Sequence, residues 1–465
     1  MNSTNFVDFF KDISNRDKKR IFNFTSGHLG NLSNPIFFNI IIKDISFLNY
    51  LYLLFKILFL LSLSIIPIKN LAFFLRASLR RILNKKLHLH KKFAVISVGG
   101  DNAKNDPYLS KILVSLNSKF DYFKIVGGNR LKNSGYFFFE QTFGLIDCLK
   151  SFVYIFLVQF LTYFSLLNCI FSKKSSKYKF LYLLSSLDEM ISGALYNNYL
   201  LNIFGKKISS YNTYKKLIFP MEGRNWEKKL VSHFDKSSTK IIGYVHCAIT
   251  PRHLSLTNKN FYSETEVPSI VITPSKMSYC LISKVFKSAK VIHGSFIREG
   301  RSFGNLLFDK NYIVFALTSS IKESKTIINS IISSKLHFKF RVEIRINPNT
   351  NSYGPIKKLI KSNNLNLYSG LMTSKPIVCL FRSSSTAIEY LRLGVNPMYI
   401  SLNSGFSNNI FDLDNIYKFN RIEIDNFDSF TPTESVYNKN KCILIANYYL
   451  RQSNCLNFIK HINER

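Results

Sequence analysis

The chain lacks the patterns that mark several large protein classes. Its seven cysteines are odd in number and include no Cys-x-x-Cys, so neither a disulfide framework nor a zinc site is indicated. Residues 1–18 are polar and lack the apolar core of a secretory signal. No helix-turn-helix, zinc-finger or RNA-binding aromatic signature is found, so we expect no nucleic-acid partner.

Acidic residues are scarce as well. The chain has 28 Asp and Glu residues against 63 Lys and Arg residues, which gives a formal net charge of +35. The basic residues are spread along the whole chain and not gathered into one arm. Such a charge attracts anionic membrane surfaces and anionic substrates. The hydrophobic content of 46% excludes a disordered protein, and 465 residues suffice for two or three domains with full cores.

Two apolar segments, 46–68 and 151–171, bear on membrane attachment. The second holds 21 residues without a charge, which is long enough to span a bilayer. A single span there would put the strands expected at 93–99 and 122–126 on the opposite side of the membrane from the remaining strands. We therefore favour in-plane or re-entrant attachment, or a buried core helix, over true spans. This predicts a peripheral or monotopic protein on an anionic membrane surface, at the cytoplasmic face of the inner membrane.

Apolar strand patterns alternate with amphipathic stretches over most of the chain, which predicts an α/β fold with parallel sheets. Two such runs indicate two Rossmann-like domains with a cleft between them. We expect an N-terminal extension at 1–90, a first domain at 91–290 and a second domain at 291–465. Further strands are expected at 216–219, 241–245, 269–272, 291–293, 312–317, 341–346, 377–381 and 398–400, and helices at 225–234, 275–286, 321–334 and 386–393.

The strand expected at 93–99 runs into a glycine turn, which is the usual first step of a Rossmann-like half. Residues 122–128 repeat that pattern. Neither carries the G-x-G-x-x-G fingerprint, so a dinucleotide site is not indicated.

The most informative stretch is 375–400. Its continuous apolar run is typical of a parallel strand covered on both faces. Thr386-x-x-Glu389 predicts a capping box that starts a helix, and Gly394 sits where a helix C-cap glycine belongs. The serine-rich turn between strand and helix can bind phosphate through free N–H groups, hydroxyls and the helix dipole. The alternative is a structural capping box with solvated serines.

Four short polar features each follow an expected strand, at the edge where open α/β sheets bind ligands. They are Phe219-Pro-Met-Glu-Gly-Arg-Asn-Trp-Glu227, Gly243-Tyr-Val-His-Cys-Ala-Ile-Thr-Pro-Arg-His253, Arg345-Ile-Asn-Pro-Asn349 and the serine turn from Arg382 to Thr386. Their order resembles that of GT-B glycosyltransferases. It is similar in particular to bacterial surface-carbohydrate biosynthesis proteins (capsule and lipopolysaccharide) related to the sialyltransferase and capsule-transferase group.

The resemblance implies transfer of a sugar from a nucleotide-activated donor, a CMP-sugar or another nucleotide-sugar, to a polysaccharide or glycolipid acceptor. The first domain would bind the acceptor and the second the donor, with no separate cofactor. Glu222, with a raised pKa, would take the acceptor proton, and His246 would polarise the leaving phosphate or bind the acceptor. The donor and its phosphates would be held by Arg345, Asn347, Arg382, Ser383, Ser384, Ser385, Thr386 and Glu389. No Asp-x-Asp motif stands out as a metal site, so a metal-independent reaction fits.

One departure from the family pattern leaves alternatives open. The His-Pro motif of the family is Asn347-Pro348 here, and Asn can donate a hydrogen bond to phosphate but cannot carry a proton or a charge. The alternatives are a CDP-polyol phosphotransferase-like enzyme and a non-catalytic surface-polysaccharide assembly protein that retains the fold. Single residues have structural alternatives too: Glu222 as a first-turn helix residue, His246 as a satisfied core histidine, and Glu227 as a solvated or paired side chain.

Overall fold

The computed structural model describes residues 92–97, 106, 109, 120–125, 136–138, 142–171, 194–211, 214–249, 253–257, 259, 262–294, 306–318, 320–346, 353–368, 373–382, 384–402, 420–432 and 439–451. The apolar segment predicted at 46–68 lies outside these residues, so its membrane attachment stays a prediction.

The first domain is built on a sheet of seven strands in which every neighbouring pair is parallel. The strand order is β3-β2-β1-β4-β5-β6-β7, the doubly wound order that reverses between β1 and β4. The strands are β1 (Phe93–Ser97), β2 (Phe120–Lys124), β3 (Tyr136–Phe138), β4 (Lys216–Pro220), β5 (Lys240–Tyr244), β6 (Ile270–Thr273) and β7 (Lys290–His293).

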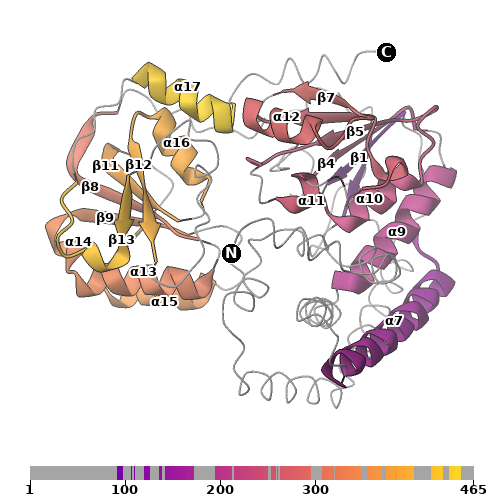
Figure 1. The fold of residues 1–465 in the computed structure, drawn as a ribbon, viewed down its shortest axis with the longest axis horizontal. Coiled ribbons are helices and arrows are strands. Elements are labelled where there is room, and N and C mark those ends of the chain that lie inside the picture. The colour runs from indigo at the N-terminus through magenta and orange to yellow at the C-terminus, as the bar shows by residue number, and fades with distance from the viewer. Residues whose placement is uncertain are drawn as a thin grey trace.

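Helices accompany this sheet, and Figure 1 shows the longest of them, α7, at the outer end of the domain. α7 packs on α9, and α9 in turn packs on α10, the helix that follows β4. The helical elements are α7 (Leu145–Phe171), α9 (Ala194–Tyr211), α10 (Asn225–Ser232), α11 (Leu254–Thr257), the 3-10 helix η5 (Glu264–Glu266) and α12 (Lys276–Ser283).

The second domain repeats the same plan with six parallel strands. Its order, β10-β9-β8-β11-β12-β13, is again the doubly wound one, and it reverses between β8 and β11. The elements are β8 (Phe308–Ala316), α13 (Ile321–Ser333), α14 (Leu336–Lys339), β9 (Arg341–Arg345), α15 (Tyr353–Ser362), β10 (Asn366–Leu367), β11 (Lys375–Phe381), α16 (Thr386–Arg392), β12 (Asn396–Ser401), β13 (Arg421–Glu423), the 3-10 helix η6 (Ile424–Asn426) and α17 (Lys439–Tyr449).

The second half of β8 and most of β11 are apolar because both faces of these central strands are covered there. Along β8, Ile313 and Phe315 pack with the core that contains α13 and α15, whereas Tyr312 and Val314 pack with the core that contains α16 and α17. The alternation follows from the two-residue side-chain period of a strand.

The last described helix joins the two domains. α17 packs on α16 of the second domain and on α12 of the first, and Figure 1 shows it between the two lobes. Met277 of α12 lies in the same apolar cluster as Ala446 of α17. Just beyond α17, the backbone N–H of Arg451 donates to the carbonyl oxygen of Pro274 at 2.8 Å.

The structure confirms the prediction of two α/β domains with parallel sheets. β7 completes the first sheet, so the two sheets divide between His293 and Phe308, slightly beyond the boundary expected at 290. The cleft between the domains stays a prediction. The apolar segment 151–171 belongs to α7, and none of the helices in the described ranges is both long and apolar enough to cross a bilayer.

Candidate functional site at the carboxyl edges of the two sheets

Strand register explains why Glu222 and His246 meet. Pro220 of β4 lies opposite Tyr244 of β5, so the residues two positions beyond each strand end emerge side by side at the carboxyl edge of the sheet. His246 Nε2 lies 2.9 Å from Glu222 Oε1, and the guanidinium of Arg224 pairs with the other carboxylate oxygen. The two predicted catalytic residues are therefore in direct contact. A satisfied core histidine would make such a contact too, so the catalytic role of His246 stays a prediction.

The carboxylate of Glu222 is more accessible than its partner, with 24% of the side chain exposed against 11% for His246. Burial alone would raise the pKa of Glu222. The hydrogen bond with His246 and the positive charge of Arg224 outweigh burial and lower the pKa to about 2. The expectation of a raised pKa at Glu222 is thus wrong, because it took no account of these two partners. Glu222 is an ionised carboxylate at neutral pH.

The carboxyl group whose pKa is raised is that of Glu227. The sequence suggested a solvated or paired side chain, but the structure shows a buried one that accepts hydrogen bonds from the backbone. Its side chain lies in the first turn of α10, is only 3% exposed, and reaches back to the loop before the helix. The carboxylate accepts hydrogen bonds from the backbone N–H of Glu222 at 3.0 Å and of Gly223 at 2.8 Å. Burial and the charge of Glu222 raise the pKa of Glu227 to about 8, against the opposing effect of Arg224 and these N–H groups. Glu227 thus holds the backbone that carries Glu222.

Gly223 makes this loop possible. Its φ of +78° lies in the left-handed region that favours glycine. A Cβ there would lie 2.7 Å from the carbonyl oxygen of Ser255 in α11. Ser255 Oγ also donates to the carbonyl oxygen of Glu222 at 3.3 Å, so α11 supports the loop from the other side.

In the second domain, Arg345 occupies the equivalent edge. It lies opposite Ala316 of β8, which in turn lies opposite Phe381 of β11, so Arg345 and the serine turn after β11 share one edge of the sheet. The guanidinium of Arg345 forms an ion pair with Glu389 at 3.2 Å. It also lies over the ring of Tyr368, with the guanidinium carbon 4.5 Å from the ring centroid.

A second guanidinium lies near Glu389. Arg392 is in the last turn of α16, and burial lowers its pKa to about 10, while the charge of Glu389 opposes that shift. Its Nε and Nη2 atoms are buried and have no hydrogen-bond partner among the described residues. A buried guanidinium with open donors is suited to an anion. The sequence analysis missed Arg392, and its only signal was a basic residue in the last turn of the helix.

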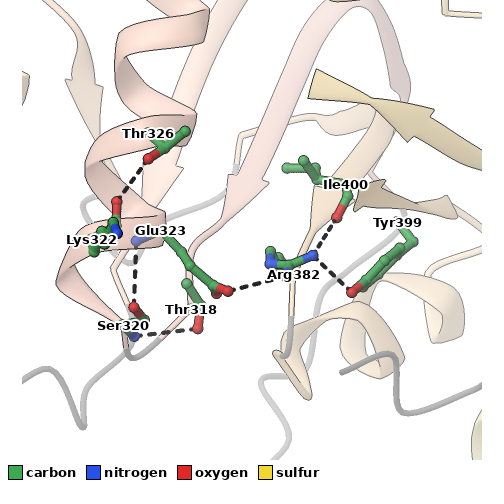
Figure 2. A network of polar contacts seen from close by, with 8 residues as sticks. All are labelled: Thr318, Ser320, Lys322, Glu323, Thr326, Arg382, Tyr399 and Ile400. Atoms are coloured by element: carbon green, nitrogen blue, oxygen red, sulfur yellow. Dashed lines mark hydrogen bonds and ion pairs between the residues drawn. The ribbon is translucent and has the colours of Figure 1, made fainter. Parts of the chain in front are cut away.

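Arg382, by contrast, is held by the protein itself. It is 1% exposed and donates to Tyr399 Oη at 2.9 Å, to the carbonyl oxygen of Ile400 at 3.1 Å, and to Glu323 Oε1 at 3.0 Å (Figure 2). Glu323 lies in the first turn of α13, whose N-cap Ser320 accepts from the backbone N–H of Glu323. This arrangement favours a structural role for Arg382 over the phosphate contact predicted from sequence.

The serine turn begins α16, but not through the predicted capping box. The N-cap is Ser385 and not Thr386, and its side chain makes no cap hydrogen bond. Glu389 instead pairs with Arg345. Ser384 is buried and its Oγ accepts weakly from the N–H of Thr386 at 3.4 Å, whereas Ser385 is exposed. The turn thus carries hydroxyls at the sheet edge.

Other predictions in this region have different outcomes. Gly394 is confirmed as a C-cap glycine, with φ +78°, and its N–H donates to the carbonyl of Leu391 while that of Val395 donates to Tyr390, the pattern of a Schellman motif. The predicted donor residues Ser383 and Asn347 lie outside the described residues, so their roles stay predictions. Within the described ranges, no group of three or more His, Cys, Asp or Glu side chains is arranged to hold a metal ion.

Comparison with known proteins shows only distant likeness. No family model matches the chain, and no curated protein matches it. It is similar to the solved structure of a mutant of S. aureus TarM in complex with Fondaparinux, alpha-GlcNAc-glycerol and UDP, with 13% identity and a TM-score of 0.34 over 58% of this chain and 59% of that chain. It is also similar to the UDP-GlcNAc 2-epimerase of Methanocaldococcus jannaschii, with 12% identity and a TM-score of 0.38 over 80% and 98% of the two chains.

A third similar structure is the wall teichoic acid polymerase TagF, with 12% identity and a TM-score of 0.34 over 88% of this chain and 99% of that chain. The chain spans only about 59% of the length of TarM. Likeness at this level concerns the fold alone. None of these names the capsule-transferase or sialyltransferase group, and that narrower resemblance stays a prediction.

Proposed function

We propose that the protein is a glycosyltransferase that moves a sugar from a nucleotide-activated donor to the hydroxyl group of a surface polysaccharide or glycolipid. The observation that carries the proposal is the ionised Glu222, held by His246 and Arg224 at the carboxyl edge of a doubly wound sheet. Open α/β sheets bind ligands at this edge. The proposal includes no metal ion.

In this reaction the acceptor hydroxyl contacts Glu222 rather than His246, because Glu222 is the more exposed of the two side chains. As the acceptor oxygen bonds to the anomeric carbon of the sugar, its proton passes to the Glu222 carboxylate. The bond between that carbon and the donor phosphate breaks at the same time, and its electron pair leaves with the nucleotide. A carboxylate with a low pKa accepts the proton late, when the hydroxyl has already become acidic by bond formation.

His246 acts on Glu222 rather than on the acceptor in this scheme. Its contact with Oε1 orients the carboxylate, and Arg224 orients the other oxygen. Glu227 positions Glu222 through the backbone N–H groups of Glu222 and Gly223. The catalytic carboxylate is thereby held on three sides before any substrate arrives, which reduces the reorganisation that the reaction requires.

The leaving nucleotide carries negative charge, and the second domain offers positive charge at its own carboxyl edge. Arg345 lies at this edge and pairs with Glu389, Arg392 lies close enough to Glu389 for its charge to act, and Ser384, Ser385 and Thr386 add hydroxyl groups. We assign the donor phosphates to this cluster, with Asn347 and Ser383 as further predicted contacts. Glu389 then competes with phosphate for Arg345, so donor binding requires that their ion pair opens.

Donor binding can be tested by thermal unfolding of the full chain with CMP, CDP, UDP, GDP and ADP. A nucleotide at one hundred times its Kd should stabilise the folded state by about 2.7 kcal/mol. Arg345→Met should abolish the shift. Arg341→Met is the matched control, because Arg341 begins the same strand at the opposite end and is 46% exposed. No shift with any nucleotide at millimolar concentration would refute the proposal.

Catalysis can be tested without the acceptor, by release of nucleotide from a nucleotide-sugar with water as the acceptor. Glu222→Gln should lower this rate by about a hundredfold or more and leave nucleotide binding intact, since the amide cannot take a proton. Glu264→Gln, an exposed carboxylate of the same domain, should leave the rate unchanged. An unchanged rate in Glu222→Gln would exclude Glu222 as the base.

A further inference from the structure

The helix α7 has two different long faces. One face packs on the protein: Cys148, Ser151 and Val158 are buried, and the ring of Tyr154 stacks on that of Tyr199 in α9 with 4.4 Å between the centroids. The start of the helix is held as well, because Asp147 pairs with Lys207 of α9 and accepts from the N–H of Gly144 at 2.6 Å. α7 is therefore fixed along the side of the first domain.

The opposite face is apolar and is exposed among the described residues. Nine large apolar side chains along about 29 Å of helix are each between 46% and 67% exposed. Their spacing of three and four residues places them in one continuous stripe. They are Leu145, Ile146, Leu149, Val153, Phe156, Leu157, Phe160, Leu161 and Phe164. Soluble monomers rarely leave so long an apolar stripe in water, so it indicates a binding surface.

The charges that neighbour the stripe in the sequence are of one sign. The sequence contains no acidic residue between Asp147 and Asp188, but five lysines: Lys150, Lys173, Lys174, Lys177 and Lys179. The first of these is exposed on α7 itself. An apolar face with basic residues beside it is suited to an anionic bilayer, where the apolar side chains enter the acyl boundary and the lysines meet the headgroups. A second copy of this chain would bring another net charge of +35 against the same surface, which opposes self-association.

We propose that the exposed stripe of α7 seats in the interface of an anionic lipid bilayer, with the helix parallel to the membrane plane. The parallel orientation follows from the packing, because the side of α7 that faces α9 is covered by protein from Cys148 to Val158. This inference is independent of the transfer chemistry. It rests on the exposed stripe of α7 and on the lysines that neighbour it in the sequence, and it specifies which residues contact lipid.

The test uses the full chain and vesicles of phosphatidylcholine with or without phosphatidylglycerol. The chain should sediment with the anionic vesicles and not with the neutral ones. The double variant Phe160→Ser, Phe164→Ser should bind at least about tenfold more weakly, because two large apolar side chains no longer leave water. Phe338→Ser is the matched control, since Phe338 is 78% exposed but belongs to α14 of the second domain. Thermal unfolding checks that each variant is folded.

The segment 46–68 is a second candidate for lipid contact, so a local readout is needed. Phe160→Trp should be quenched by lipids brominated on the acyl chain, and Phe338→Trp should not. The only native tryptophan, Trp226, is 4% exposed and serves as a constant background. The proposal is overturned if the fluorescence of Phe160→Trp is not quenched while the protein is bound to vesicles, or if the chain does not bind anionic vesicles. It is also overturned if sedimentation velocity shows that the parent chain is a dimer and that the double variant is a monomer.

Discussion

The ion pair between the buried Arg382 and the partly exposed Glu323 makes a quantitative prediction about stability. Replacement of Arg382 by Met removes three hydrogen bonds at a site that is 1% exposed, and it leaves Glu323 and Tyr399 without the guanidinium. Removal of one partner from a buried pair costs about 3–5 kcal/mol. Glu323→Gln should cost about 2–3 kcal/mol, because the amide still accepts a hydrogen bond but leaves the cation uncompensated.

The assay is urea denaturation followed by far-ultraviolet circular dichroism, for both single variants and the double variant. The double variant should lose about 1–3 kcal/mol less than the sum of the singles, since the second change removes a charge that the first has stranded. Arg341→Met is the control, because its pair with Asp309 lies at the surface and such pairs contribute at most about 1 kcal/mol. A loss below about 1 kcal/mol in Arg382→Met, together with weaker nucleotide binding, would refute the structural role and restore Arg382 to the donor site.

Three further predictions concern glycine positions, a buried carboxyl group and the attachment of α7. Gly223→Ala should cost about 2 kcal/mol or more in urea denaturation, from its positive φ and the clash with α11, whereas Gly354→Ala, with open space around a helical glycine, should stabilise by up to about 1 kcal/mol. Glu227 has a folded pKa of about 8 against an ordinary value of 4.5, so the folded state holds the proton more tightly. Its contribution to stability is therefore complete below pH 4.5 and is lost as the pH rises toward 8, by up to about 1.4 kcal/mol per pH unit. Glu227→Gln should flatten the fall in unfolding free energy between about pH 5.5 and 7.5, and an unchanged slope would contradict the buried, raised pKa. Lys207→Met should cost about 1 kcal/mol, because its pair with Asp147 is partly exposed, and a protease should then cut α7 faster than in the parent.

Much of the fold could be predicted from sequence because the central strands are buried on both faces. The run ending at Phe381 is apolar throughout, and β11 lies where that run predicts it. Prediction failed where a strand is short or exposed. β8 begins at Phe308, four residues before the predicted start, because its first residues are largely exposed and polar. β10 and β13 are edge strands of two and three residues with exposed positions, and no pattern of burial marks them.

The location of the candidate site could be predicted from the sequence, but the pKa of Glu222 and the partner of Arg382 could not. Glu222 and His246 follow strands, and the rule for parallel sheets places both at one edge. Their contact depends on the register of β4 and β5, which the separate strand patterns do not contain. The low pKa of Glu222 depends on that contact, so its sign was predicted wrongly. Arg382 was assigned to phosphate for a similar reason, because its partner Glu323 is 59 residues away in sequence.

The position of α17 has a consequence for synthesis of the chain. α12 emerges from the ribosome about 160 residues before α17, which covers part of it. At about 5–20 residues per second, that surface stays open for roughly 10–30 s of translation. The first domain therefore cannot reach its final packing until α17 has been made, and a chain that stops before α17 would leave Met277 uncovered.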